Sequence, residues 1–134
     1  MVNLNSTWSI WFHSSKNNDW SKESYVFLYK TNVAEDFWGV YKLISNKHYE
    51  SGIVFFMRDN IFPDWSCPEN INGGFLSVKI ATKSNENYFN DVMRRWVERL
   101  ISETLTSDKI PNGLSISPKS GHCILKVWFG EKHI

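Results

Sequence analysis

Hydrophobic and polar residues alternate in several short segments of the chain, a pattern typical of β-strands with one covered face. In the segment STWSIWF, Trp8, Ile10 and Phe12 fall on one face, and Ser9 and Trp11 fall on the other. Similar β-rich segments occur at residues 25–29, 52–57, 73–82, 114–119 and 122–129. The sequence therefore predicts six strands, the last two joined by a tight turn as a closing hairpin.

Two other segments carry apolar residues at helical spacing. Residues 31–44, TNVAEDFWGVYKLI, have Thr31 or Asn32 as a candidate N-cap and two acidic residues in the first turn. Residues 85–105 predict a longer amphipathic helix, whose buried stripe contains Phe89, Met93, Trp96 and Leu100. Hairpin strands with helices between them predict an α+β fold, a single domain over residues 1–134 with both helices on one face of an antiparallel sheet. The opposite face of the sheet would be open.

Aromatic residues make up 16% of the chain, and two of its seven tryptophans lie in polar loops. Trp20 ends a loop after the first strand, and Trp65 stands in FPDWSCPEN after the third, so both could emerge at the same end of the sheet. Two neighbouring indoles can hold a flat, electron-poor ring between them, such as an alkylated purine. The alternative is that each tryptophan anchors its own loop.

The predicted helices carry further apolar positions at the edge of their buried stripes. On a helical wheel Trp38 lies about 100° from Phe37, and Val97 and Ile101 lie beyond the centre of the stripe on the second helix. An exposed apolar patch across the two helices would suit a helical peptide partner. The alternative is that the buried stripe is simply wide.

The charge balance and the sequence motifs limit the classes of function that we expect. With 15 basic and 14 acidic residues, the net charge of +1 argues against a non-specific grip on long nucleic acids but allows a local anionic ligand. The chain has no apolar run of about 20 residues, so we expect no membrane span. Cys67 and Cys123 lack metal-ligand spacing, which favours a reducing, cytoplasmic setting and predicts no metal site. Since no catalytic motif or phosphate loop is present, we expect a binding protein without a cofactor and not an enzyme.

The segments STWSIWF, DWSKES, VAEDFWGVY, RDNIFPDW, NINGGFL and RRWVERLI occur in a characteristic order and spacing. Over nearly its whole length the sequence resembles the translation initiation factor 4E family. The resemblance implies a curved sheet that binds the 7-methylguanosine cap of messenger RNA on its concave face and a helical peptide on its convex face. It implies that Trp20 and Trp65 sandwich the methylated base. It also implies that Trp38, with Val97 and Ile101, receives a peptide of scaffold factor 4G or of a 4E-binding repressor.

The sequence departs from this family beside Trp65, where the family has a glutamate that binds the guanine edge and this chain has Ser66. A hydroxyl supplies no negative charge, so guanine selectivity would be weakened. Asp64 or Glu69 could act as a substitute acceptor. Alternatively, Asp64 caps a turn after Pro63, and Glu69 is a solvated loop charge.

The sequence also departs from the family at the residues that would bind the triphosphate of the cap. Phe75 follows Gly74 where family members typically have an arginine, and Ile124 replaces a hairpin lysine. Lys119 stands where the family has an arginine in the last hairpin that binds the triphosphate of the cap, and His122 could add a second donor to phosphate. Because a lysine is a point charge and not a bidentate fork, we expect weaker and more salt-sensitive phosphate binding. The family also continues with another helix and strand, so this chain would be a short natural member or a truncated one.

Two functions remain open. In the first, a monomer binds the capped 5′ end of messenger RNA and recruits an initiation scaffold through Trp38. In the second, the chain keeps the peptide site but has lost or altered cap recognition, and acts as a decoy or regulator of initiation. Ser66, Phe75 and Ile124 favour the second function, and the paired loop tryptophans favour the first.

Overall fold

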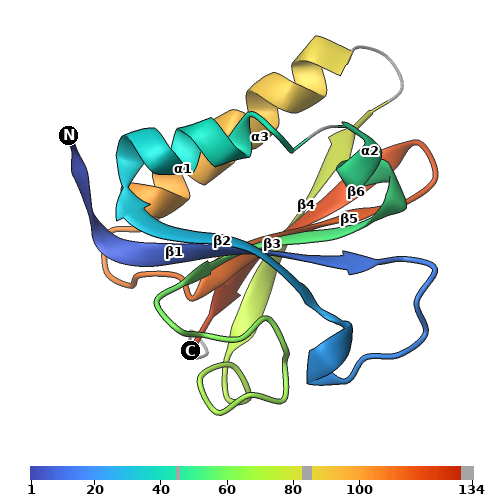
Figure 1. The fold of residues 1–134 in the computed structure, drawn as a ribbon, viewed down its shortest axis with the longest axis horizontal. Helices are drawn as coiled ribbons and strands as arrows, with labels where there is room; N and C mark the ends of the chain where they lie inside the picture. The colour runs from blue at the N-terminus through green and yellow to red at the C-terminus, as the bar shows by residue number, and fades with distance from the viewer. Residues whose placement is uncertain (45, 83–85, 131–134) are drawn as a thin grey trace.

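The computed structural model of the protein describes residues 1–44, 46–82 and 86–130. These residues form one antiparallel sheet with the strand order β2-β1-β3-β5-β6-β4 (Figure 1). The strands are β1 (Asn3–Ser14), β2 (Val26–Val33), β3 (Gly52–Arg58), β4 (Gly74–Ala81), β5 (Gly113–Pro118) and β6 (His122–Phe129). The predicted six-stranded antiparallel α+β fold is confirmed.

The main helices α1 (Ala34–Tyr41) and α3 (Glu86–Ile101) lie near their predicted positions. The predicted start of α1 is wrong, because Thr31–Val33 extend β2 and Val33 occupies the N-cap position. The side-chain oxygen of Thr31 accepts a hydrogen bond from the backbone N–H of Val33 at 3.0 Å, inside the strand end. Two short elements were not predicted: the 3₁₀ turn η1 (Lys22–Ser24) and helix α2 (Asn46–Ser51) are too short to carry a clear periodicity.

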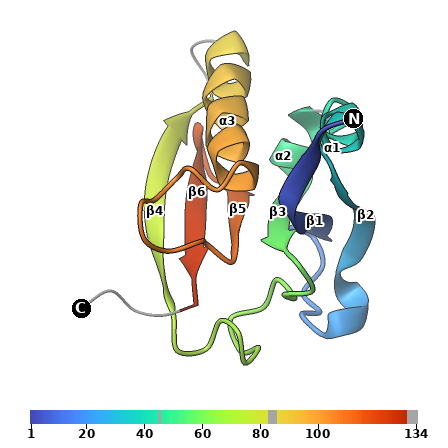
Figure 2. The same ribbon diagram turned by 90° about the vertical axis from the view of Figure 1, so that its left-hand side faces the viewer.

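All three α-helices cover the same face of the curved sheet (Figures 1 and 2). Helix α1 packs on β1 and β2, α2 on β3 and β5, and α3 on β1, β4 and β5. Alternate strand residues point toward the helices and are fully or almost fully buried, which is the period of two expected for a covered face. They include Trp8, Ile10, Val54, Phe56, Leu114, Ile116, Leu125 and Val127.

A second, smaller apolar cluster lies on the opposite face of the sheet. Its buried members are Phe55, Met57, Ile61 and Trp128, and Trp65 packs against them. The loops from β1 to β2 and from β3 to β4 lie on the side of the sheet away from α1 and α3 (Figure 1). The face predicted to be open is therefore partly covered by its own loops. Within the described residues, no helix is long and apolar enough to cross a membrane.

Candidate functional site

The two loops and the strands beneath them enclose a cavity of about 280 Å³ on this face. Trp20 and Trp65 both line it. The prediction that the two loops emerge at the same end of the sheet is wrong, because β1 and β3 are antiparallel and Ser14 at the end of β1 pairs with Gly52 at the start of β3. The loops leave opposite ends of the two strands and meet over the same face. The floor and walls come from other elements: Tyr25, Ile53, Phe55, Pro63, Asp64, Ser115, Ser117, Lys126 and Trp128. Five of the eleven lining residues are aromatic, and the lining also includes one carboxylate and one ammonium group.

Trp20 stacks on a buried histidine. The ring centroids of His13 and Trp20 are 3.7 Å apart and the rings are nearly parallel, at 3°. His13 is completely buried, and its ring nitrogens lie 3.0 Å from the carbonyl oxygen of Ser14 and 2.8 Å from that of Asp19. These bonds hold His13 in place, while Trp20 remains half exposed. One face of the Trp20 indole is therefore supported by the protein.

Trp65 is supported in the same way on the other side of the cavity. Its ring stacks on Trp128 with centroids 3.9 Å apart and planes at 11°. Trp128 is buried, and its indole N–H donates to the hydroxyl of Ser115 at 3.0 Å. Phe75 contacts Trp65 at a centroid distance of 5.0 Å. Sequence reasoning missed these supporting rings because they come from distant strands.

Buried amides hold the loop that carries Trp65. The side-chain amide of Asn70 donates to the carbonyl oxygens of Phe62 at 3.0 Å and Asp64 at 2.8 Å. Asn112 donates to the side-chain oxygen of Asn70 at 2.9 Å and to the carbonyl of Glu69 at 2.8 Å. Because buried amides are costly when unpaired, this network fixes the loop backbone against the sheet.

Of the three candidate acceptors for the guanine edge, Asp64 alone lines the cavity; Ser66 and Glu69 are exposed and do not. One carboxylate oxygen of Asp64 accepts hydrogen bonds from the backbone N–H of Ser66 at 2.8 Å and from its hydroxyl at 2.6 Å. Ser66 therefore positions the neighbouring carboxylate. The other carboxylate oxygen has no hydrogen bond recorded within the described residues.

The candidate phosphate residues Lys119 and His122 lie at the tip of the β5–β6 hairpin and do not line the cavity. The backbone N–H of Lys119 donates to the carbonyl of His122 at 2.8 Å, and the ring Nδ1 of His122 lies 3.0 Å from the carbonyl oxygen of Ser120. Lys126 does line the cavity, and sequence reasoning missed it. Lys126 lies two residues before Trp128 in the same strand, so the sequence already indicated that the two side chains share a face of the sheet.

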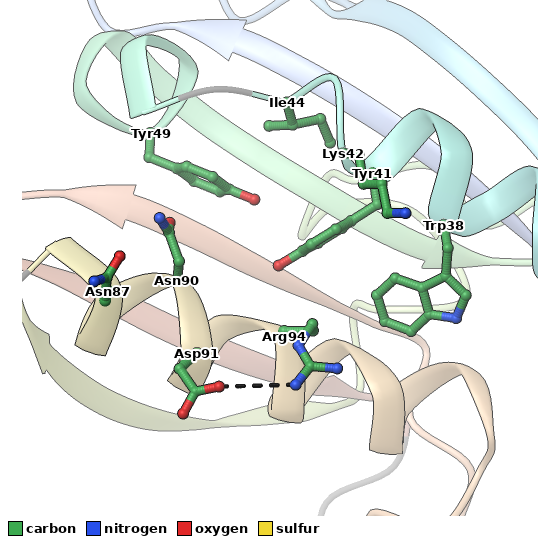
Figure 3. Close-up of a pocket in the computed structure, with 9 residues that line it drawn as sticks. All are labelled: Trp38, Tyr41, Lys42, Ile44, Tyr49, Asn87, Asn90, Asp91 and Arg94. Atoms are coloured by element: carbon green, nitrogen blue, oxygen red, sulfur yellow. Dashed lines mark ion pairs between the residues drawn. The ribbon is translucent and has the colours of Figure 1, made fainter.

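Trp38 lies on the helix side of the sheet and is half-buried, as the helical wheel predicts. It borders a groove of about 540 Å³ between α1, α2 and α3 (Figure 3). Figure 3 shows the hydroxyls of Tyr41 and Tyr49 and the side chain of Arg94 pointing into this groove. Burial raises the pKa values of both tyrosines, so both stay neutral at physiological pH.

Val97 and Ile101 do not contribute to this surface. Both are buried in the core beneath α3, so the expectation that they form part of an exposed apolar patch is wrong. The buried stripe of α3 is wide, as the alternative interpretation held: it includes Val97 and Ile101 as well as the predicted Phe89, Met93 and Leu100, and Trp96 lies at its edge, only partly buried. The side chains that α3 contributes to the groove beside Trp38 are therefore polar: Asn87, Asn90, Asp91 and Arg94.

A curved antiparallel sheet with helices on one face and an aromatic cavity on the other defines the class of fold found in cap-binding translation factors. The family model for Eukaryotic initiation factor 4E matches residues 3–133. The chain belongs to this family.

Curated relatives support the assignment. The chain is 28% identical to Eukaryotic translation initiation factor 4E-2 of Schizosaccharomyces pombe, over 93% of this chain and 52% of that protein. It is 29% identical to Eukaryotic translation initiation factor 4E-1 of Caenorhabditis elegans, over 78% of this chain and 50% of that protein. The chain thus spans about half the length of these relatives.

Solved structures share the fold at low sequence identity. The complex of Ascaris suum eIF4E-3 with the m7G cap has a TM-score of 0.84 at 15% identity, covering 97% of this chain and 74% of that one. Schistosome eIF4E complexed with m7GpppG and 4E-BP has a TM-score of 0.82 at 19% identity, covering 98% of this chain and 73% of that one.

Proposed function

We propose that the chain binds the 7-methylguanosine cap of messenger RNA, with the methylated base held between Trp20 and Trp65. The observation that carries the proposal is that both predicted indoles line one cavity of about 280 Å³. This volume is close to the lower end of the range for small-molecule sites, about 300–1,000 Å³. A single base with its ribose outside the cavity suits that size.

The supporting rings explain how the indoles would work. Trp20 has His13 behind it, and Trp65 has Trp128 behind it. Because each indole is already held on one face, little side-chain freedom is lost when a ligand stacks on the other face. The positive charge of the methylated base adds cation–π attraction to stacking.

Asp64 takes the role that a neighbouring glutamate would have. Its carboxylate lines the cavity and is oriented by Ser66. The oxygen that Ser66 leaves unoccupied can accept the N–H donors on the guanine edge. In this arrangement Ser66 acts through Asp64, and Glu69 has no part in base recognition.

On the helix side, the groove beside Trp38 would receive a helical peptide from an initiation scaffold or a repressor. The proposal rests on Trp38 and on the groove in Figure 3, and it does not include the buried Val97 and Ile101. The cap cavity and this groove lie on opposite faces of the sheet. The two ligands would therefore bind at separate sites.

The proposal gives the chain a binding role in cytoplasmic translation and no catalytic step. Cys67, in the loop that carries Trp65, is buried, and burial together with the charge of Asp64 raises its pKa. A raised pKa disfavours the thiolate that a nucleophilic cysteine needs.

Titration with 7-methylguanosine triphosphate and with GTP tests the proposal, using calorimetry so that no tryptophan is needed as a reporter. We expect wild type to prefer the methylated nucleotide. Trp65→Ala should weaken binding by about 5- to 150-fold, because base stacking on an aromatic residue is worth about 1–3 kcal/mol. Trp38→Ala is the matched control and should bind the nucleotide as wild type does.

A helical peptide from scaffold factor 4G or from a 4E-binding repressor should behave in the opposite way, binding wild type and Trp65→Ala but not Trp38→Ala. Cap binding is refuted if folded wild type binds neither nucleotide at millimolar concentration. If the peptide still binds in that case, the chain has the regulatory function that the sequence left open.

A further inference from the structure

Lys126 extends from the middle of β6 onto the face that carries the cavity. It stands two residues before Trp128, and strand periodicity places both side chains on the same face. Lys126 is half-buried and lines the same cavity as Trp20 and Trp65. A positive charge is thus built into the proposed nucleotide site itself.

An aromatic ring holds this lysine in position. The Nζ atom of Lys126 lies 4.5 Å from the centroid of the Phe75 ring on the neighbouring strand β4. Phe75 also contacts Trp65, so the ammonium group, the phenyl ring and one of the proposed stacking indoles form a connected group. An ammonium over a ring face still has N–H donors available for a second partner.

Lys126 forms no ion pair within the described part of the chain. The ion pairs recorded there involve Arg58, Arg94 and Arg95, and none involves Lys126. Asp64 lies on the same cavity wall, but the described residues show no ion pair between its carboxylate and Lys126. The ammonium group of Lys126 is therefore available to an anionic ligand.

A second lysine lies beside it on β4. In the β4–β6 register Lys126 is opposite Ser77, and Lys79 is opposite Ile124. Lys79 is therefore a diagonal cross-strand neighbour of Lys126, at a typical distance of about 7–8 Å, and it is exposed. The two lysines flank Ile124, the position at which the sequence resemblance leads one to expect a lysine.

We propose that Lys126, with Lys79 beside it, binds the phosphate of a purine nucleotide whose base lies between Trp20 and Trp65. This inference rests on the proposed cap-binding function and moves the phosphate site from the hairpin tip to the middle of β4 and β6. Lys126 contacts the phosphate nearest the ribose, because it shares the cavity with the base.

The hairpin tip is too far away to make the same contact. His122 lies four residues before Lys126 along β6, which corresponds to about 13 Å of extended strand. Lys119 is at the same end of the hairpin. Lys119 can therefore reach only the distal phosphates of a triphosphate chain.

The ligands that separate these contacts are 7-methylguanosine, its monophosphate and its triphosphate. We expect wild type to bind the monophosphate more tightly than the nucleoside. Lys126→Gln should lower monophosphate affinity by about tenfold while leaving nucleoside affinity unchanged, because a charge-assisted contact is lost without a change in stacking. The loss should shrink as salt is raised.

Two lysine variants serve as matched controls. Lys119→Gln should leave monophosphate binding unchanged and weaken only triphosphate binding. Lys42→Gln removes the same charge from the groove on the other face and should leave all three affinities unchanged. Far-ultraviolet circular dichroism and thermal unfolding establish that each variant is folded.

The outcomes distinguish the two proposals. If wild type binds the nucleoside but Lys126→Gln loses no more monophosphate affinity than Lys42→Gln, the phosphate assignment is wrong and cap binding stands. Equal losses for nucleoside and monophosphate would also overturn it, because Lys126 would then contact the base. If wild type binds none of the three ligands, both proposals fail.

Discussion

Neutralising Asp64 is the sharpest test of how the cavity recognises a guanine edge. In Asp64→Asn the remaining side-chain oxygen would keep the hydrogen bonds from the backbone and hydroxyl of Ser66. The new NH₂ group would then face the ligand. Since N1 and N2 of guanine are also donors, an accepting contact becomes a contact between donors. The loop itself should keep its conformation.

The size of the effect follows from the exposure of Asp64. A hydrogen bond to a charged group contributes about 1.5–3 kcal/mol, and solvent screening favours the lower end for a half-buried carboxylate. A loss of about 1.5 kcal/mol corresponds to about tenfold weaker binding of 7-methylguanosine triphosphate. Selectivity should fall too, because wild type gains from the exocyclic amino group and the variant does not.

Calorimetric titration with the 7-methylguanosine and 7-methylinosine triphosphates measures both effects. Wild type should prefer the guanine ligand, which carries the amino group, and Asp64→Asn should lose that preference. Glu69→Gln is the matched control, because it removes the same charge from an exposed position outside the cavity. Binding by Asp64→Asn that equals wild type for both ligands would refute the reasoning, as would an equal loss in Glu69→Gln.

Three further perturbations test the residues that support the cavity. Asn70→Ala should lower the free energy of unfolding in urea by about 2–3 kcal/mol and weaken nucleotide binding, because two backbone carbonyls lose their buried donor; unchanged binding would mean that the loop is held in another way. Gly113→Ala places a Cβ only 2.6 Å from the carbonyl oxygen of Phe56 and should cost about 1–3 kcal/mol, visible as a lower melting temperature; a melting temperature equal to wild type would contradict the packing. Burial, with smaller contributions from Asp64 and Cys67, raises the pKa of Tyr25 to about 12 from an ordinary value of 10. The neutral Tyr25 hydroxyl therefore contributes fully to the free energy of unfolding below pH 10, and this contribution is lost as the pH rises toward 12. Tyr25→Phe should flatten that alkaline decline in urea denaturation, and an identical decline in the variant would assign it to other groups.

Most of the fold was predictable because strand alternation and helical spacing are local properties. The period of two in STWSIWF predicted that Trp8 and Ile10 share one face of β1, and both are buried in the core under the helices. The short helix α2 was not predictable in this way, since its six residues span less than two turns. The start of α1 was misplaced because Thr31 is equally suited to a strand and to an N-cap.

The candidate site was predictable only in part. The polar loop context indicated Trp20 and Trp65, and both line the cavity. Their supporting rings could not be predicted, because His13 lies seven residues before Trp20 and Trp128 lies sixty-three residues after Trp65 in sequence. On α3 a helical wheel gives the direction of a buried stripe but not its width, which depends on how the sheet curves under the helix. That is why Val97 and Ile101 were misplaced.

The departures at residues 66, 75 and 124 are better interpreted together with their spatial neighbours than position by position. Ser66 supplies no carboxylate, but it hydrogen-bonds to the carboxylate of Asp64 inside the cavity. Phe75 supplies no cation, but its ring holds the ammonium group of Lys126. Ile124 supplies no cation either, and Lys79 lies directly opposite it on β4. Each missing charge thus has a charge of the same sign two residues away in sequence or on the neighbouring strand. The placement of these charges beside the cavity supports the proposal that the chain binds a nucleotide through contacts at positions other than those the resemblance implies.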